Sequence, residues 1–304
     1  MKRKRLGKSD LVVSEIGLGC MSLSRDEKES IRIIHAALDA GVNFLDTADL
    51  YQQGRNEAWV GKALKGKRQE VILATKVGNR WEPGKEGWFW DPSKAYIKEA
   101  VKGSLRRLGT DYIDLYQLHG GTIDDPIDET IEAFEELKQE GVIRWYGISS
   151  IRPNVIREYV KRSDIVSVMM QYSVLDRRPE ESLFDLLRGH GISAIVRGPL
   201  AQGLLSDRTL TGGPPTRPYL DYTPEEIVRV VQQLAAMADE RRTISQLALR
   251  FALAPEVVAT AVPGASSMEQ LHDNIQAADV PELTPEELAQ IRAFSKVNIY
   301  TQHR

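Results

Sequence analysis

The sequence predicts an α/β protein of the (β/α)8 barrel class, with an N-terminal β-hairpin and an additional C-terminal helix. Short apolar segments alternate with longer amphipathic segments eight times along the 304 residues. Neither a linker nor a change of composition divides the chain. Asp46, Lys76 and His119 are ionisable residues that each end an apolar segment. We therefore expect residues 1–304 to form one barrel domain rather than two doubly wound halves.

The chain begins with a predicted hairpin, in which residues 3–6 and 12–15 flank a turn at residues 7–10. Eight short, mainly apolar segments follow and are predicted as the barrel strands: residues 16–19, 43–46, 71–76, 113–119, 143–149, 165–171, 192–197 and 257–262. Such lengths are typical of strands that are buried on both faces. Because parallel strands place their carboxyl ends on one rim, residues at these ends are expected to share a pocket.

Amphipathic segments between these strands predict helices. Residues 27–40 place Ile31 and Ile34 on one face and end before Gly41, a residue typical of helix ends. Ser93 is a predicted N-cap for a helix that ends at residue 108, and Pro153 opens the helix after the fifth strand. The other predicted helices are residues 56–64, 127–140, 180–188, 224–239, 244–254, 268–278 and 285–297.

Composition excludes several classes of function. The formal net charge of −3 gives no overall field that would attract nucleic acid or a membrane surface. No apolar run reaches the roughly 18 residues that a membrane span needs. Residues 1–5 are basic, but they lack the apolar core of a signal peptide, and we interpret them as a solvated edge strand rather than a targeting or nucleic-acid signal. A single cysteine, Cys20, excludes an internal disulfide and fits a cytoplasmic location.

The rim residues suit the reduction of a carbonyl group. The developing alkoxide needs a proton and a stabilising charge. A tyrosine has an ordinary pKa of about 10, and a nearby ammonium group should lower it. Tyr51 is therefore the expected acid, Lys76 its electrostatic partner and Asp46 the anion that balances the lysine. His119 is expected to donate to the substrate oxygen or to relay a proton to Tyr51.

Four motifs occur in an order that resembles the aldo-keto reductase family, and the resemblance covers nearly the whole chain. They are the Asp-Thr-Ala-x-x-Tyr run that begins at Asp46, the strand-end Lys76, the strand-end His119, and Gly-Ile-Ser at residues 147–149. The resemblance implies a reductase that converts aldehydes or ketones to alcohols with NADP(H). The alternative is a barrel that binds the nucleotide as a redox sensor or protein-interaction subunit with little turnover. Because a pure sensor needs only the nucleotide clamp, the complete set of rim residues favours the reductase.

The resemblance also implies the residues that contact the cofactor. They follow the strand ends: Gly19, Cys20, Met21, Asp46, Ser149, Ser150, Gln171, Arg197, Gly198, Leu200, Gly203, Gly264, Ser266, Gln270, Asp273 and Asn274. Gly17-Leu-Gly19 by itself is similar to a Rossmann fingerprint but lacks the third glycine. Where the family usually stacks an aromatic ring on the nicotinamide, this chain has Arg197, whose guanidinium either lies on the ring or turns to a phosphate or carboxylate.

The remaining expectations concern cofactor preference, substrate and assembly. Between Gly264 and Asn274 there is no Lys or Arg for a 2′-phosphate, so NAD(H) is a possible second cofactor. Residues 78–92 form a long segment with Trp81, Trp88 and Trp90, which either wall a carbonyl substrate or pack among themselves. With five histidines and no His-x-His pair, no metal site is expected. We expect a small carbonyl substrate, and a monomer or weak homo-oligomer.

Overall fold

Eight parallel strands form the centre of the computed structural model, which describes residues 1–304. Their hydrogen-bonded order is β12-β11-β10-β9-β8-β5-β4-β3. They are β3 (Leu18–Gly19), β4 (Phe44–Asp46), β5 (Ile72–Val77), β8 (Ile113–Leu118), β9 (Ile143–Ser149), β10 (Ser167–Gln171), β11 (Ser193–Arg197) and β12 (Val258–Val262). Parallel bridges between Ile16 and Ala261 and between Gly19 and Gly264 join the first strand to the last. The predicted barrel class is therefore confirmed.

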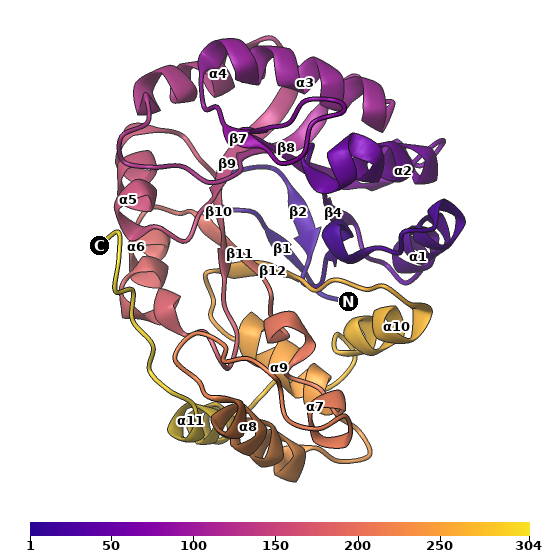
Figure 1. Ribbon diagram of the computed structural model, residues 1–304, viewed down its shortest axis with the longest axis vertical. Helices are drawn as coiled ribbons and strands as arrows, with labels where there is room; N and C mark the ends of the chain where they lie inside the picture. The colour runs from indigo at the N-terminus through magenta and orange to yellow at the C-terminus, as the bar shows by residue number, and fades with distance from the viewer.

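Helices surround the barrel, as the view in Figure 1 shows. They are α1 (Glu27–Asp39), α2 (Arg55–Ala63), α3 (Lys94–Leu108), α4 (Ile127–Gln139), α5 (Pro153–Arg162), α6 (Leu183–Gly189), α7 (Arg208–Thr211), α8 (Pro224–Met237), α9 (Ile244–Leu253), α10 (Met268–Gln276) and α11 (Pro285–Phe294). Ser93 caps α3, as predicted, by accepting from the backbone N–H of Tyr96. The last helix ends at Phe294 rather than at residue 297. None of these helices combines the length and the apolar character needed to cross a membrane.

The N-terminal hairpin closes the bottom of the barrel. It consists of β1 (Arg3–Arg5) and β2 (Val12–Ser14), which pair in antiparallel register and lie across the centre of the ring in Figure 1. Leu6, Leu11 and Val13 are buried in one cluster with Phe44 and Leu115 from the barrel interior. Burial of this apolar surface makes the barrel a packed core. A ligand therefore has access at the opposite rim, where the strands end.

Two segments that follow barrel strands contain short elements that were not predicted. Residues 78–92 contain a second small hairpin, β6 (Asn79–Arg80) and β7 (Phe89–Trp90), whose register pairs Asn79 with Trp90. The segment after β11 contains the short helix α7. Each hairpin strand has only two residues, too few for an apolar alternation to be recognised in the sequence.

Candidate active site

Lys76 lies at the centre of the site and is fully buried. Its Nζ donates to Asp46 Oδ2 at 2.6 Å and to the carbonyl oxygen of Thr47 at 2.8 Å. A third hydrogen bond, of 3.2 Å, reaches the hydroxyl of Tyr51. These contacts use all three donors of an ammonium group. The ends of β4 and β5 thus bring together three of the four predicted catalytic residues.

The imidazole of His119 completes the group. It follows the last residue of β8, and its ring centroid lies 5.8 Å from that of Tyr51 in an edge-to-face arrangement. Burial, with Lys76 and Arg197 nearby, lowers the pKa of His119 to about 3. The ring is therefore neutral at physiological pH, which favours its use as a hydrogen-bond donor over a proton relay through an imidazolium. Its Nδ1 is buried without a partner.

The electrostatics of Tyr51 differ from the expectation. Lys76 does act to lower the pKa of the phenol, but burial outweighs it and the pKa is raised above its ordinary value. Burial likewise raises the pKa of Asp46. Although burial alone would lower the pKa of Lys76, Asp46 and Tyr51 together hold it above its ordinary value. The ammonium therefore stays charged, and the phenol stays protonated, at neutral pH.

Two supporting residues were not identified from the sequence. Gln117 on β8 donates from Nε2 to Asp46 Oδ1 at 3.2 Å. The buried carboxamide of Asn56 accepts from Thr47 Oγ1 at 2.7 Å and donates to the carbonyl oxygen of Cys20 at 2.8 Å. Asn56 thereby ties the end of β3 to the end of β4 and holds the residue whose carbonyl accepts from Lys76. The strand pattern of residues 113–119 could have indicated Gln117, since it lies two residues before His119 on the same face.

The residues predicted to face the nicotinamide lie at adjacent strand ends. Ser149, Gln171 and Arg197 end β9, β10 and β11, and Gln171 is in register with Arg197. Arg197 Nη2 donates to Gln171 Oε1 at 3.4 Å, and its guanidinium forms no ion pair with a carboxylate. Burial lowers the pKa of Arg197. Ser150 is also buried, and its Oγ accepts from the backbone N–H of Arg152 at 3.2 Å.

The predicted cofactor residues around α10 form hydrogen bonds within the protein. Gln270 Oε1 accepts from the backbone N–H of Ser266 at 2.9 Å, and Asn274 Nδ2 donates to the carbonyl oxygen of Gly264 at 3.1 Å. Both side chains therefore hold the loop before α10. Asp273 faces α9 and accepts from Thr243 Oγ1 at 2.9 Å. Direct contact of these three side chains with a nucleotide stays a prediction.

The two glycine-containing loops also lie on this rim. Gly19 follows the barrel closure and its N–H donates to the carbonyl oxygen of Pro263 at 3.0 Å. Cys20 is buried there, whereas Met21 is 64% exposed. Gly198 and Gly203 have φ values of 63° and 87°, which favour glycine. These two glycines flank Leu200 in the loop after β11.

The three tryptophans of residues 78–92 have distinct environments. The indole N–H of Trp81 donates to the carbonyl oxygen of Asp49 at 2.9 Å, and that of Trp90 donates to Asp125 Oδ1 at 2.9 Å. Trp90 also packs against Gly78, where an added Cβ would lie 2.5 Å from the ring. Trp88 is 56% exposed. Trp81 and Trp90 thus fix the hairpin on the rim, while Trp88 is free to contact a ligand.

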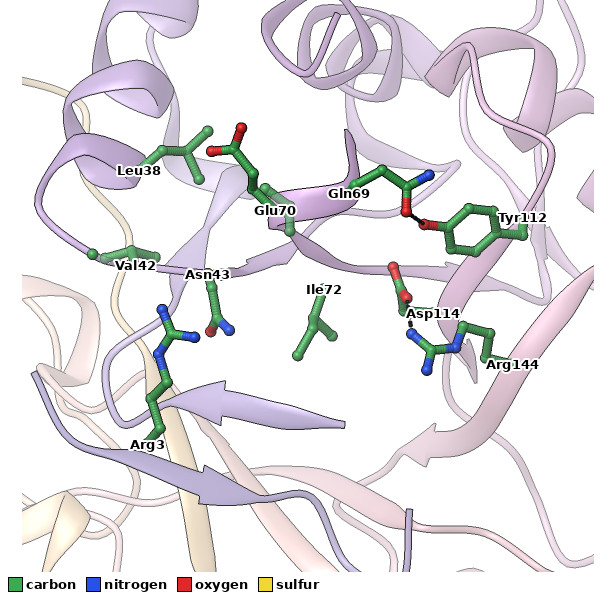
Figure 2. A pocket seen from close by; sticks show the side chains of 12 residues that line it. Arg3, Leu38, Val42, Asn43, Gln69, Glu70, Ile72, Tyr112, Asp114 and Arg144 are labelled. Atoms are coloured by element: carbon green, nitrogen blue, oxygen red, sulfur yellow. Dashed lines mark hydrogen bonds and ion pairs between the residues drawn. The ribbon is translucent and has the colours of Figure 1, made fainter. Parts of the chain in front are cut away.

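A cavity of about 510 Å³ lies at the other end of the barrel, and Figure 2 shows its lining. Arg144 Nη1 donates to Asp114 Oδ1 at 2.9 Å, and Tyr112 donates to Gln69 Oε1 at 3.3 Å. Four of its polar side chains therefore bond in two pairs. Because these residues lie at the starts of the strands, this cavity is separate from the Lys76 site and its contacts serve stability.

Comparison with known proteins agrees with this architecture. A family model described as "Aldo/keto reductase family" matches residues 15–296. The chain is 56% identical to "Uncharacterized oxidoreductase YqkF" of Bacillus subtilis, with all of both chains covered. It is 33% identical to "NADH-specific methylglyoxal reductase" of Escherichia coli, covering 92% of this chain and 94% of that one.

A solved structure shows the same likeness in three dimensions. The holo form of aldo-keto reductase AKR11C1 from Bacillus halodurans has a TM-score of 0.94 and 63% sequence identity to this chain. The match covers 100% of this chain and 99% of that one. The family model, the relatives and the solved structure agree, and this chain belongs to the aldo/keto reductase family of oxidoreductases.

Proposed function

We propose that the protein reduces aldehydes or ketones to alcohols, with NADPH as hydride donor and Tyr51 as proton donor. The hydrogen bond from Lys76 Nζ to the Tyr51 hydroxyl, at 3.2 Å, carries this proposal. An ammonium group can only donate, so the Tyr51 oxygen is the acceptor of this bond. The O–H of Tyr51 is then free to donate to a substrate oxygen. As that oxygen gains negative charge, the phenol protonates it and Lys76 stabilises the phenolate.

His119 provides the second donor in this proposal. With a pKa of about 3 the imidazole is neutral, so one ring nitrogen carries a proton. Because Nδ1 is enclosed without a partner, Nε2 is the nitrogen that can face the substrate oxygen. Asp46, held by Lys76 and Gln117, balances the buried ammonium.

The rim fits a nicotinamide nucleotide. Arg197 is a largely enclosed cation without a carboxylate partner, which an anionic or polarisable ligand would satisfy. A reduced nicotinamide, when bound, supplies the hydride. Ser149 and Gln171 would hold its carboxamide, because a hydroxyl and an amide side chain offer donors and acceptors. The backbone of the Gly198–Gly203 turn would hold the phosphates, with the loop before α10 around the adenosine.

We propose only a weak preference for NADPH over NADH. No Lys or Arg lies between Gly264 and Asn274. Arg242, next to the Thr243 that bonds to α10, is already paired with Glu287 at 2.7 Å. The NADH-specific name of the Escherichia coli relative is consistent with a family that accepts either nucleotide. A preference for NADPH beyond about a thousandfold in kcat/KM would contradict this proposal.

Cofactor oxidation with a panel of aromatic aldehydes tests the function. We expect turnover by the wild type and a loss of about 10²- to 10⁴-fold in kcat for Tyr51→Phe. Tyr112→Phe, at the far end of the barrel, is the matched control and should retain activity. Activity that survives Tyr51→Phe would remove Tyr51 from the role of acid. Nucleotide binding without turnover of any aldehyde would instead support the sensor alternative.

A further inference from the structure

A second, smaller cavity of about 260 Å³ lies on the catalytic rim. It is lined by Arg25, Gln52, Arg55 and Trp59. Arg25 belongs to the loop after β3, and Gln52 is the residue after Tyr51, in the 3₁₀ turn between β4 and α2. We call this cavity the Arg25–Arg55 pocket. It is smaller than the roughly 300 Å³ at which drug-sized sites begin, so it suits a single functional group rather than a whole ligand.

The charge in this pocket is unbalanced. No carboxylate lines it, and neither Arg25 nor Arg55 forms an ion pair, although most basic side chains of the protein do. The one polar contact of Arg55 is a 3.4 Å bond from Nε to the carbonyl oxygen of Gln52. The acidic residues adjacent in sequence are engaged elsewhere, as the N-cap of α1 or in ion pairs: Asp26, Glu27 and Glu57. Two guanidinium groups thus lack an anion.

The backbone beneath the pocket is shaped by a strained turn. Gln52 and Gln53 have φ values of 52° and 53°, in the left-handed backbone region that residues other than glycine rarely adopt. Gln52 Oε1 is buried without a hydrogen-bond partner. The turn leads into the nine-residue helix α2, whose N-cap Gly54 has no side-chain capping bond. The uncapped end of α2 adds positive potential to that of the arginines. Strain and an orphaned polar atom gathered in one place are typical of a ligand site.

We propose that the Arg25–Arg55 pocket binds an oxyanion, a carboxylate or a phosphate. The planar guanidinium groups match the two oxygens of such a group, and the Gln52 amide can turn its NH₂ toward it. Trp59, which is 8% exposed, forms the apolar wall. The oxyanion has two sources: an acidic group on the carbonyl substrate, or a free anion. For the first source, the inference rests on the proposed reductase function.

The first experiment compares two aldehydes that differ by one carboxylate. The ratio of kcat/KM for 4-carboxybenzaldehyde to that for benzaldehyde is measured in the wild type and in Arg25→Gln/Arg55→Gln. We expect the ratio to fall at least about tenfold in the double variant. Arg157→Gln, which removes an exposed and unpaired arginine on α5, is the control and should leave the ratio unchanged.

The second experiment does not depend on turnover. Binding of inorganic phosphate is measured by calorimetry with NADPH saturating, so that the nucleotide's own phosphate sites are filled. A lowered aldehyde ratio in the double variant supports a substrate carboxylate. An unchanged ratio, with phosphate affinity lost only in the double variant, supports a free anion. If the ratio and the phosphate affinity both stay as in the wild type, the proposal is overturned. If neither aldehyde is reduced by the wild type, the reductase function fails, while calorimetry still decides the pocket.

Discussion

Replacement of Lys76 by methionine is the sharpest test of the site. Methionine is similar in size but carries neither charge nor donor. The substitution removes the bonds to Asp46, Tyr51 and the Thr47 carbonyl, of 2.6, 3.2 and 2.8 Å. Asp46 is then a buried carboxylate without a cation, although Gln117 still donates to it. Because burial already raises the pKa of Asp46, the carboxyl is expected to take up a proton and limit the cost.

The expected magnitude follows from the loss of one partner of a buried pair. Such losses cost about 3–5 kcal/mol of unfolding free energy. Protonation of Asp46 places this variant near the lower limit, at about 3 kcal/mol. Replacing both partners by neutral groups removes most of the penalty. Lys76→Met/Asp46→Asn should therefore lose only about 1 kcal/mol, which makes it about 2 kcal/mol more stable than Lys76→Met.

Urea unfolding at pH 7 measures these stabilities, and aldehyde-dependent cofactor oxidation measures the chemistry. The double variant should regain stability but not activity, because the ammonium next to Tyr51 is still missing. Lys28→Met, at an exposed lysine without an ion pair, serves as the control. A single variant that loses less than about 1 kcal/mol, or a double variant no more stable than Lys76→Met, would refute the reasoning.

Three further changes test other parts of the site. The folded pKa of His119, about 3, lies below its unfolded value of about 6.5, so the stability it contributes is present above pH 6.5 and is lost as pH falls toward 3. Between pH 7 and pH 5, the free energy of unfolding measured in urea should therefore fall by up to about 2 kcal/mol less in His119→Gln than in the wild type. Equal decreases in the two proteins would contradict this pKa. Arg197→Tyr should tighten oxidised relative to reduced nucleotide by about tenfold in titrations of both forms, because the oxidised ring is cationic, and an unchanged ratio would exclude stacking by Arg197. Asn56→Ala should lower the free energy of unfolding in urea by about 2–4 kcal/mol, because it leaves the Thr47 hydroxyl and the Cys20 carbonyl without a hydrogen-bond partner. A decrease below about 1 kcal/mol would mean that those groups find other partners.

Much of the fold could be predicted because its signal is local and repeated. Apolar segments of strand length alternate with amphipathic helices, and residues such as Ser93 mark helix starts. The small hairpin of β6 and β7 escaped prediction, since its strands of two residues carry no periodicity. The helix before β11, α6, is also shorter than the predicted helix at residues 180–188, because the chain at Arg178–Glu181 forms a separate 3₁₀ helix.

The sequence therefore predicted that the strand-end residues lie close together. It did not predict their pKa values. Asp46, Lys76 and the residue after β8 had to converge, because parallel strands end on one rim. Only the folded chain showed that burial outweighs Lys76 at Tyr51, because the extent of burial depends on everything packed around the phenol. Likewise, Asn274 has a helical position that spacing predicts, but its partner, the Gly264 carbonyl, depends on how the loop before α10 is folded. The local sequence pattern decides which residues lie at the strand ends, and so on the rim of the barrel. Packing around those residues in the folded chain decides their charge states and their hydrogen-bond partners.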